Sequence, residues 1–198
     1  EQLEREKTQA VLTSLKHQFS PHYLFNNFNT LYSLIEEKSD KAGDFLLKLS
    51  ALYRTILQNQ EEVIPLADEL QAFRDYLFLL KTRFHEDIQM EYQLYPRNGK
   101  QYYLPPLSLQ TLLENAIKHS HFDEDHPLRI KMEQKGEWIT LTNSIYTAKT
   151  ETLPSYGIGL ENIRSRYQLL SEQEVKIQQS KECFTVSLPL LSLEKQSL

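Results

Sequence analysis

Several residue types are scarce in this chain of 198 residues, and each scarcity excludes a class of protein. The single cysteine, Cys183, excludes an internal disulfide and a multi-cysteine metal site, and it fits a reducing, cytoplasmic setting. There are 22 basic residues against 27 acidic ones, so the chain lacks the basic surplus that binding to nucleic acid usually needs. No apolar run approaches the roughly 18 residues of a membrane span. The remainder, 40% hydrophobic and 25% charged, is typical of a globular protein.

The region 1–87 is predicted to be helical. Apolar residues recur there at spacings of three and four, which is the pattern of helices that pack on other helices. The three stripes are Leu24, Phe28, Leu31 and Ile35; Phe45, Leu49, Leu52 and Ile56; and Leu66, Leu70, Phe73, Leu77, Leu80 and Phe84. Because two or three helices bury such narrow stripes poorly by themselves, we expect this region to dimerise into a bundle.

The region 88–190 is predicted to mix strands and helices. Alternating segments predict strands over 88–94, 128–134, 137–143, 174–180 and 183–190, and helical periodicity predicts helices over 104–119 and 158–170. The pair Lys135-Gly136 is expected to turn a hairpin. The polar segment 144–155 is predicted to be a loop, and residues 191–198 a tail. The predicted fold class is therefore α + α/β, with a domain boundary near residue 87.

His22 lies in the stretch SPHYLFNNFN, residues 20–29. Pro21 is expected to bend the helix because it has no amide hydrogen and its ring crowds the preceding turn. Helical spacing places His22, Asn26 and Asn29 on one side, opposite the apolar stripe. Two interpretations stay open: an exposed histidine beside a proline bend, or a nucleophile whose neutral imidazole keeps a free lone pair.

A second cluster lies in LLENAIKHS, residues 112–120. Glu114 and Lys118 are four residues apart, and so are Asn115 and His119. The cluster fits an ordinary amphipathic helix with a surface ion pair. It also fits a phosphate site, because amide and carboxylate oxygens suit Mg²⁺ and a lysine suits phosphates.

Glycine is rare, and two of the five glycines stand close together. Gly157 and Gly159 come directly before or within the start of the predicted helix 158–170. Free backbone N–H groups at a helix start, with no Cβ in the way, form an anion site. A plain helix-initiating turn is the alternative.

Three motifs in this order, PHYLFNNFN, LPPLSLQTLLENAIKH and GIGLENIRSRY, resemble the LytS-type family of bacterial sensor histidine kinases. The similarity runs from about residue 12 to about residue 190 and includes DELQAFRDYLFLLKTRF at 68–84. The resemblance implies that region 1–87 dimerises and carries the phosphoacceptor, and that region 88–190 is a Bergerat-type α/β sandwich that binds ATP and Mg²⁺. It implies an ATP-dependent protein-histidine kinase of a two-component system, which passes its phosphoryl group to an aspartate of a response regulator.

The same resemblance implies roles for individual residues. His22 would be the phosphorylated histidine, and Asn115 would be the Mg²⁺-binding asparagine. Glu114 would be a candidate base or water-orienting group. Lys118 and His119 would be candidate phosphate contacts.

The glycine motif and the strand before it complete the implied nucleotide site. Gly157 and Gly159 would flank the triphosphate under a mobile lid formed by residues 144–156. The family has an Asp-Asn-Gly box after this strand, whose aspartate binds the adenine amino group, but here the strand ends Leu141-Thr142-Asn143-Ser144. Asn143 would meet adenine through its neutral amide, a weaker contact than a charge-assisted one.

Because the Asp-Asn-Gly box is absent, two other functions remain open. One is a degenerate, dimeric signalling scaffold that binds nucleotide weakly or not at all. The other is an ATPase of the gyrase type, which releases phosphate without forming a phosphoprotein. The setting expected from the resemblance is the cytoplasmic domain of a membrane-anchored bacterial protein, with a sensor region upstream that is absent from this chain.

Overall fold

The computed structural model describes residues 21–58, 61–94, 101–146 and 158–192. The chain divides into two compact units, Glu1–Gln58 and Asn59–Leu198. Within the described ranges, no helix combines the length and the apolarity needed to cross a lipid bilayer.

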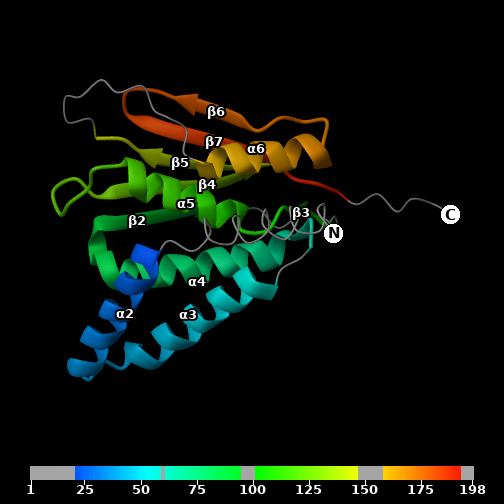
Figure 1. The fold of residues 1–198 in the computed structure, drawn as a ribbon. Coiled ribbons are helices and arrows are strands. Elements are labelled where there is room, and N and C mark those ends of the chain that lie inside the picture. The colour runs from blue at the N-terminus through cyan, green and yellow to red at the C-terminus, as the bar shows by residue number, and fades with distance from the viewer. Residues whose placement is uncertain (1–20, 59–60, 95–100, 147–157, 193–198) are drawn as a thin grey trace, which may run out of the picture. The chain divides into compact units, whose positions relative to one another are not determined.

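The first unit contains two packed helices, α2 (Pro21–Glu36) and α3 (Lys41–Gln58) (Figure 1). The turn between them places Lys38 at φ 53°, and the amide of Ser39 donates to the carbonyl of Leu34. The predicted stripe of α3 is confirmed as buried: Phe45, Leu49, Leu52 and Ile56.

The predicted stripe of α2 is not buried in the single chain. Phe28 and Ile35 are 50% and 57% exposed, whereas Asn27 and Leu34 are buried. The physical reason is that one neighbouring helix covers only a narrow side of α2, so the rest of its apolar surface stays open.

The second unit is built on a five-stranded sheet of order β2-β4-β5-β7-β6. Its strands are β2 (Ile88–Gln93), β4 (Leu128–Lys135), β5 (Trp138–Ser144), β6 (Lys176–Gln179) and β7 (Cys183–Pro189). β2 runs parallel to β4 and the other pairs are antiparallel. The predicted β4–β5 hairpin is confirmed, with Gly136 at φ 61° in its turn.

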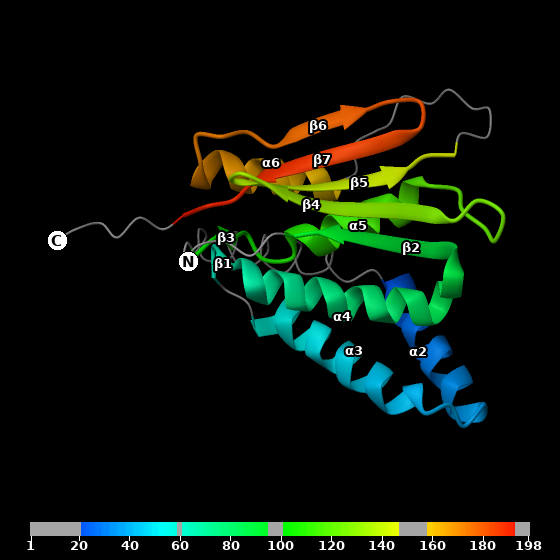
Figure 2. The same cartoon turned by 180° about the vertical axis from the view of Figure 1, so that it is seen from behind.

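Helices α5 (Ser108–His119) and α6 (Ile158–Leu170) cover one face of this sheet, as the two opposite views in Figures 1 and 2 show. Residues of the covered face are buried, among them Ile130, Met132 and Leu141. The other face is polar: Thr140 and Ser187 lie 2.9 Å apart through their hydroxyl oxygens. The structure therefore confirms the predicted α + α/β class, with the helices in one layer and a mixed sheet in the other.

Helix α4 (Leu66–Phe84) belongs to the second unit, followed by the short helix η1 (His85–Asp87). It packs against α5 and β2, and it buries Phe73, Leu77 and Leu80 of the predicted stripe. The division at 58/59 thus differs from the sequence-based boundary near residue 87. Periodicity identifies the apolar face of a helix but not the partner that covers it.

Helix α5 begins four residues later than the sequence indicates. Residues Tyr103–Leu104 form strand β3, which pairs with β1 (Ile64–Pro65), and Leu107 takes a left-handed conformation at φ 63°. No side chain of α5's own N-cap residue caps the helix. Glu69 of α4 does so instead: its Oε2 accepts from Leu107 N at 3.0 Å and its Oε1 from Leu109 N at 2.8 Å.

Burial of Glu69, which is 1% exposed, raises its pKa from an ordinary 4.5 to about 7, although backbone N–H groups of residues 107–109 and the charge of Arg166 oppose this. A carboxyl group whose pKa is raised by folding stabilises the fold fully below its unfolded pKa, and this contribution is lost as the pH rises through the folded pKa.

We therefore expect the unfolding free energy of the wild type to fall relative to that of Glu69→Gln by about 3 kcal/mol between pH 4.5 and pH 8. Urea denaturation across this range measures the difference. Asp68→Asn, an exposed neighbour in the same helical turn, should follow the wild-type curve. If the unfolding free energies of the wild type and Glu69→Gln changed in parallel with pH, the expected titration of Glu69 would be contradicted.

Candidate functional site

Helix α5 presents the predicted residues of its motif on different sides. Glu114, Lys118 and His119 are exposed, whereas Asn115 is half-buried. The apolar residues Leu109, Leu112, Leu113 and Ala116 hold the opposite side of the helix in the core. The sequence folds in this way because its apolar residues recur at three and four positions.

Asn115 lies against the start of α6. A Cβ atom added to Gly159 would lie 2.7 Å from Thr111 Cγ2 and 3.6 Å from Asn115 Nδ2. Contacts of 2.7 Å between carbon atoms are repulsive, so only glycine lets the two helices approach this closely. Gly159 and Asn115, far apart in sequence, thus lie close together in the second unit.

The amide nitrogen of Asn115 is buried and has no hydrogen-bond partner among the described residues. An unpartnered buried donor costs about 1–3 kcal/mol, which a hydrogen-bond acceptor at this position, such as a phosphate oxygen, would offset. In the described ranges, no group of three His, Cys, Asp or Glu side chains could hold a metal ion. A cation at Asn115 would therefore need most of its ligands from phosphate and water, which is how Mg²⁺ is commonly bound.

Glu114 is held by α4 and its own helix. Its carboxylate accepts a hydrogen bond from Gln110 Nε2 at 3.0 Å and another from Tyr76. Desolvation of the carboxyl group raises the pKa of Glu114, and these bonds and the charge of Lys118 oppose the rise. Desolvation, followed by the charge of Lys118, lowers the pKa of His119, which favours its neutral form.

Asn143 lies at the end of β5, beside the C-terminal end of α5. Its Nδ2 donates to Ser120 Oγ at 3.2 Å and to the carbonyl of Ser144 at 3.1 Å. Ser120 Oγ in turn donates to the same carbonyl at 3.2 Å. Both bonds of Asn143 to described residues use the amide nitrogen and neither uses Oδ1, which is the atom that could accept a hydrogen bond from an adenine amino group.

Two predicted residues fall wholly or partly outside the described structure. His22 lies in the first turn of α2, but its side chain is outside the described part. Gly157 and the expected lid from residue 147 onward also lie outside the described residues. His22 belongs to the first unit, and the other predicted site residues belong to the second.

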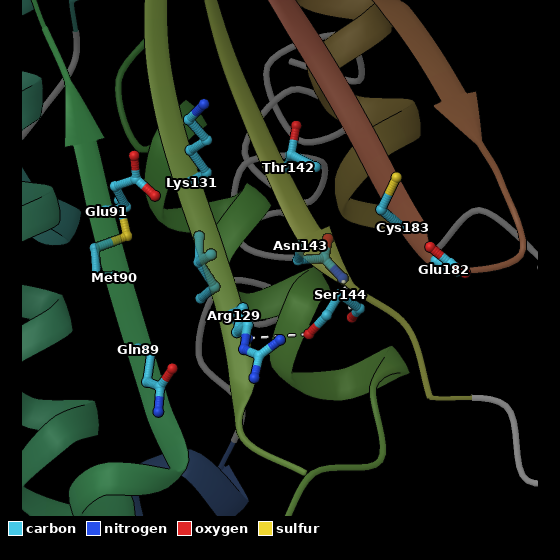
Figure 3. Close-up of a pocket in the computed structure, with 11 residues that line it drawn as sticks. Gln89, Met90, Glu91, Arg129, Lys131, Thr142, Asn143, Ser144, Glu182 and Cys183 are labelled. Carbon is cyan, nitrogen blue, oxygen red and sulfur yellow. Dashed lines mark hydrogen bonds between the residues drawn. The ribbon is translucent and has the colours of Figure 1, made fainter.

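A pocket of about 420 Å³ lies on the sheet face that α5 and α6 leave open (Figure 3). Its lining residues include Gln89, Arg129, Lys131, Thr142 and Cys183. Among the predicted site residues that the structure describes, Asn143 alone lines it. The pocket is therefore distinct from the contact between Asn115 and Gly159.

The structure adds residues that the motifs do not single out. Thr111 contacts the glycine, Ser120 holds Asn143, and Glu69 caps α5. Thr111 could have been found from its position one turn before Asn115. No local signal reveals Glu69 or Ser120, because their partners lie 38–40 and 23–24 residues away in the chain.

The tight contact at Gly159 generates a stability prediction. Gly159→Ala should lower the unfolding free energy by about 1–3 kcal/mol, because the new methyl group overlaps Thr111 Cγ2. Thr111→Ser removes that carbon and keeps a hydroxyl for the bond to the Leu107 carbonyl, so the double variant should recover most of the loss.

Gly43→Ala is the matched control, since it also replaces a helical glycine but meets no atom within 4 Å. It should be neutral or stabilising by up to about 1 kcal/mol. Urea denaturation measures all four variants. The contact would be contradicted by an unfolding free energy of Gly159→Ala equal to that of the wild type, or by no recovery of that free energy when Thr111→Ser is added.

Comparisons with known proteins agree with the sequence motifs. The model of the family described as histidine kinase matches residues 10–88. The chain is 36% identical to the sensor protein LytS of Staphylococcus haemolyticus over 67% of this chain and 23% of that protein. It is 37% identical to the sensor histidine kinase BtsS of Escherichia coli K12 over 71% of this chain and 26% of that protein.

Among solved structures, the cytoplasmic segment of the histidine kinase QseC aligns with 76% of this chain and 95% of its own, with 17% identity and a TM-score of 0.45. The chain spans about a quarter of the length of these two curated relatives. Its motifs and these identities show that the chain belongs to the LytS-type family of sensor histidine kinases.

Proposed function

We propose that this chain is the phosphotransfer region of a two-component sensor histidine kinase. In this proposal it transfers the γ-phosphoryl group of ATP to His22 and then to an aspartate of a response regulator. Family membership supports the proposal. The observation that carries it is the unpartnered, buried amide of Asn115 beside Gly159.

Different residues of the second unit would bind different parts of the nucleotide. Asn115 would hold Mg²⁺ through its side-chain oxygen, and Mg²⁺, when bound, would neutralise phosphate charge. The N–H groups at the start of α6, near Gly157 and Gly159, would bind phosphate oxygens. Lys118 and His119 would supply further phosphate contacts from the exposed side of α5.

Adenine would meet the end of β5. The amide nitrogen of Asn143 is fixed by Ser120 and the Ser144 carbonyl, so the side chain is oriented before a ligand arrives. The Oδ1 atom would then accept from the adenine amino group as an aspartate would, without the charge. We therefore infer weaker binding than with the family's aspartate, rather than none.

His22 would act as the nucleophile. One ring nitrogen attacks the γ-phosphorus through its lone pair, the bond from that phosphorus to the ADP oxygen breaks, and the other ring nitrogen loses its proton. Glu114 is the candidate acceptor, because desolvation raises its pKa. Since His22 and Asn115 belong to different units, the reaction would require an arrangement of the two units in which the imidazole meets the γ-phosphate nearly in line.

Dimerisation would use the open apolar side of α2. Phe25, Phe28, Tyr32 and Ile35 are between 50% and 66% exposed, and they recur at spacings of three and four. A second copy of the chain would cover this side and complete a helical bundle. Membrane anchoring and a sensor region, which the family resemblance implies, would belong to a longer protein, since this chain spans only 23% and 26% of the two relatives.

Incubation with labelled ATP and Mg²⁺ tests the proposed reaction. The wild type should incorporate label that is stable in base and labile in acid, as a phosphohistidine is. His22→Gln should incorporate none, and Asn115→Ala should lose at least tenfold in rate.

His126→Gln is the control, since His126 is an exposed histidine paired with Asp123. It should keep the wild-type rate. Label that persists in His22→Gln would refute His22 as the acceptor, and release of inorganic phosphate without label would favour an ATPase. Absence of both would favour the scaffold function.

If the chain dimerises through α2, a charge placed on the exposed side of this helix should lower the molecular mass measured in solution. Phe28→Asp should shift the chain toward monomer, because it places a charge in the centre of the exposed apolar side. Leu169→Asp makes the same change at a residue that is 88% exposed on α6, and it should leave the mass unchanged. Sedimentation equilibrium measures both, and a dimer that survives Phe28→Asp would place the interface elsewhere.

A further inference from the structure

We propose that Glu69 is a positioning residue for the nucleotide site, and that it couples the entry of the chain into the second unit to the position of Asn115. This inference rests on the proposed function, because it takes Asn115 as a contact of Mg·ATP. Glu69 itself touches no proposed ligand atom.

The first step is the cap on α5. Glu69 is a buried charged residue, and both of its carboxylate oxygens accept backbone N–H groups at the start of that helix. The donors are the amides of Leu107, which itself takes a left-handed conformation, and of Leu109. With no cap from its own N-cap side chain, α5 depends on a carboxylate that comes from another helix.

The second step is the entry of the chain. Strand β1 pairs with β3, placing Ile64 opposite Leu104, and the amide of Leu66 donates to the carbonyl of Tyr102 at 2.8 Å. The segment that arrives from the first unit is therefore tied to residues 102–104, directly before α5. A shift at the start of α4 would therefore displace the start of α5, both through the paired strands β1 and β3 and through Glu69.

The third step includes α6. Arg166 Nη1 donates to the Pro106 carbonyl at 3.0 Å. Tyr167, the next residue, is buried, its hydroxyl has no hydrogen-bond partner among the described residues, and the charge of Glu69 acts on it electrostatically. Helices α4 and α6 thus meet at the same end of α5.

The last step leads to the site. Leu107, whose amide donates to Glu69, accepts through its carbonyl from Thr111 Oγ1 at 2.7 Å and from Thr111 N at 3.0 Å. Thr111 is the residue that contacts Gly159, and Asn115 follows one turn later. Displacing the cap therefore moves the surface against which the start of α6 rests.

Coupling of this kind is reciprocal. If the cap strengthens binding of Mg·ATP by some factor, then Mg·ATP must strengthen the cap by the same factor. A residue with only a general structural role would lower stability without this link. Two measurements separate these cases: a double-mutant cycle, and hydrogen exchange at the capped amides.

The cycle uses the full chain at pH 8 and measures Mg·ATP dissociation constants by calorimetry. Glu69→Gln should weaken binding about tenfold, since only one of its terminal atoms can accept a hydrogen bond. In the Asn115→Ala background the same change should weaken binding by less than about twofold, because neighbours in one network are not additive. Asp68→Asn, an exposed neighbour, should bind as the wild type does.

The exchange measurement uses the wild type alone, so it decides the matter even where Glu69→Gln does not fold. Saturating Mg·ATP should slow exchange of the Leu107 and Leu109 amides about tenfold.

Equal binding by Glu69→Gln, additive losses in the cycle, or unchanged exchange at both amides would overturn the positioning role while leaving the proposed function intact. A wild type that binds no Mg·ATP would overturn the proposed function, and the positioning role with it.

Discussion

The placement of helix α5 is the constraint on which the rest of the structure depends. Its apolar side lies in the core over the sheet, and three polar or steric contacts fix its position along and about its axis. Glu69 holds its first turn, Gly159 allows α6 to lie against its middle, and Ser120 ties its far end to β5. Each described residue of the second unit that is proposed to meet the nucleotide is either on α5 or held against it.

This placement explains how a neutral amide could serve where the family has a charged one. An asparagine free to rotate would present donor and acceptor atoms equally. The amide nitrogen of Asn143 is used by Ser120 and by the Ser144 carbonyl, and these bonds fix which atom remains for a ligand. Orientation before binding reduces the entropy lost on binding, which partly offsets the weaker contact.

Much of the second unit could be predicted from the sequence because its signals are local. Helix α6 and the five strands of the sheet follow from the hydrophobic period, and the β4–β5 hairpin follows from Lys135-Gly136. The proximity of Asn115 and Gly159 could also be inferred, since both lie in motifs of one known family.

The parts that could not be predicted depend on contacts between distant residues. Nothing in the apolar pattern of α4 shows that its partners are α5 and β2, so the division at 58/59 could not be predicted from the sequence. The late start of α5 depends on the β1–β3 pair and on Glu69, whose partners are 38 and 40 residues away. The face of α2 was predicted as core, but covering it needs more than the one neighbouring helix.

The central claim is that the contact between Asn115 and the start of α6, rather than the pocket on the open face of the sheet, receives the nucleotide. Calorimetric titration with ATP, with and without Mg²⁺, of the wild type, Asn115→Ala and Arg129→Ala tests this claim most directly. The account predicts Mg²⁺-dependent binding by the wild type and by Arg129→Ala, and at least tenfold weaker binding by Asn115→Ala. No heat at millimolar nucleotide, or binding that survives Asn115→Ala and is lost in Arg129→Ala, would contradict it.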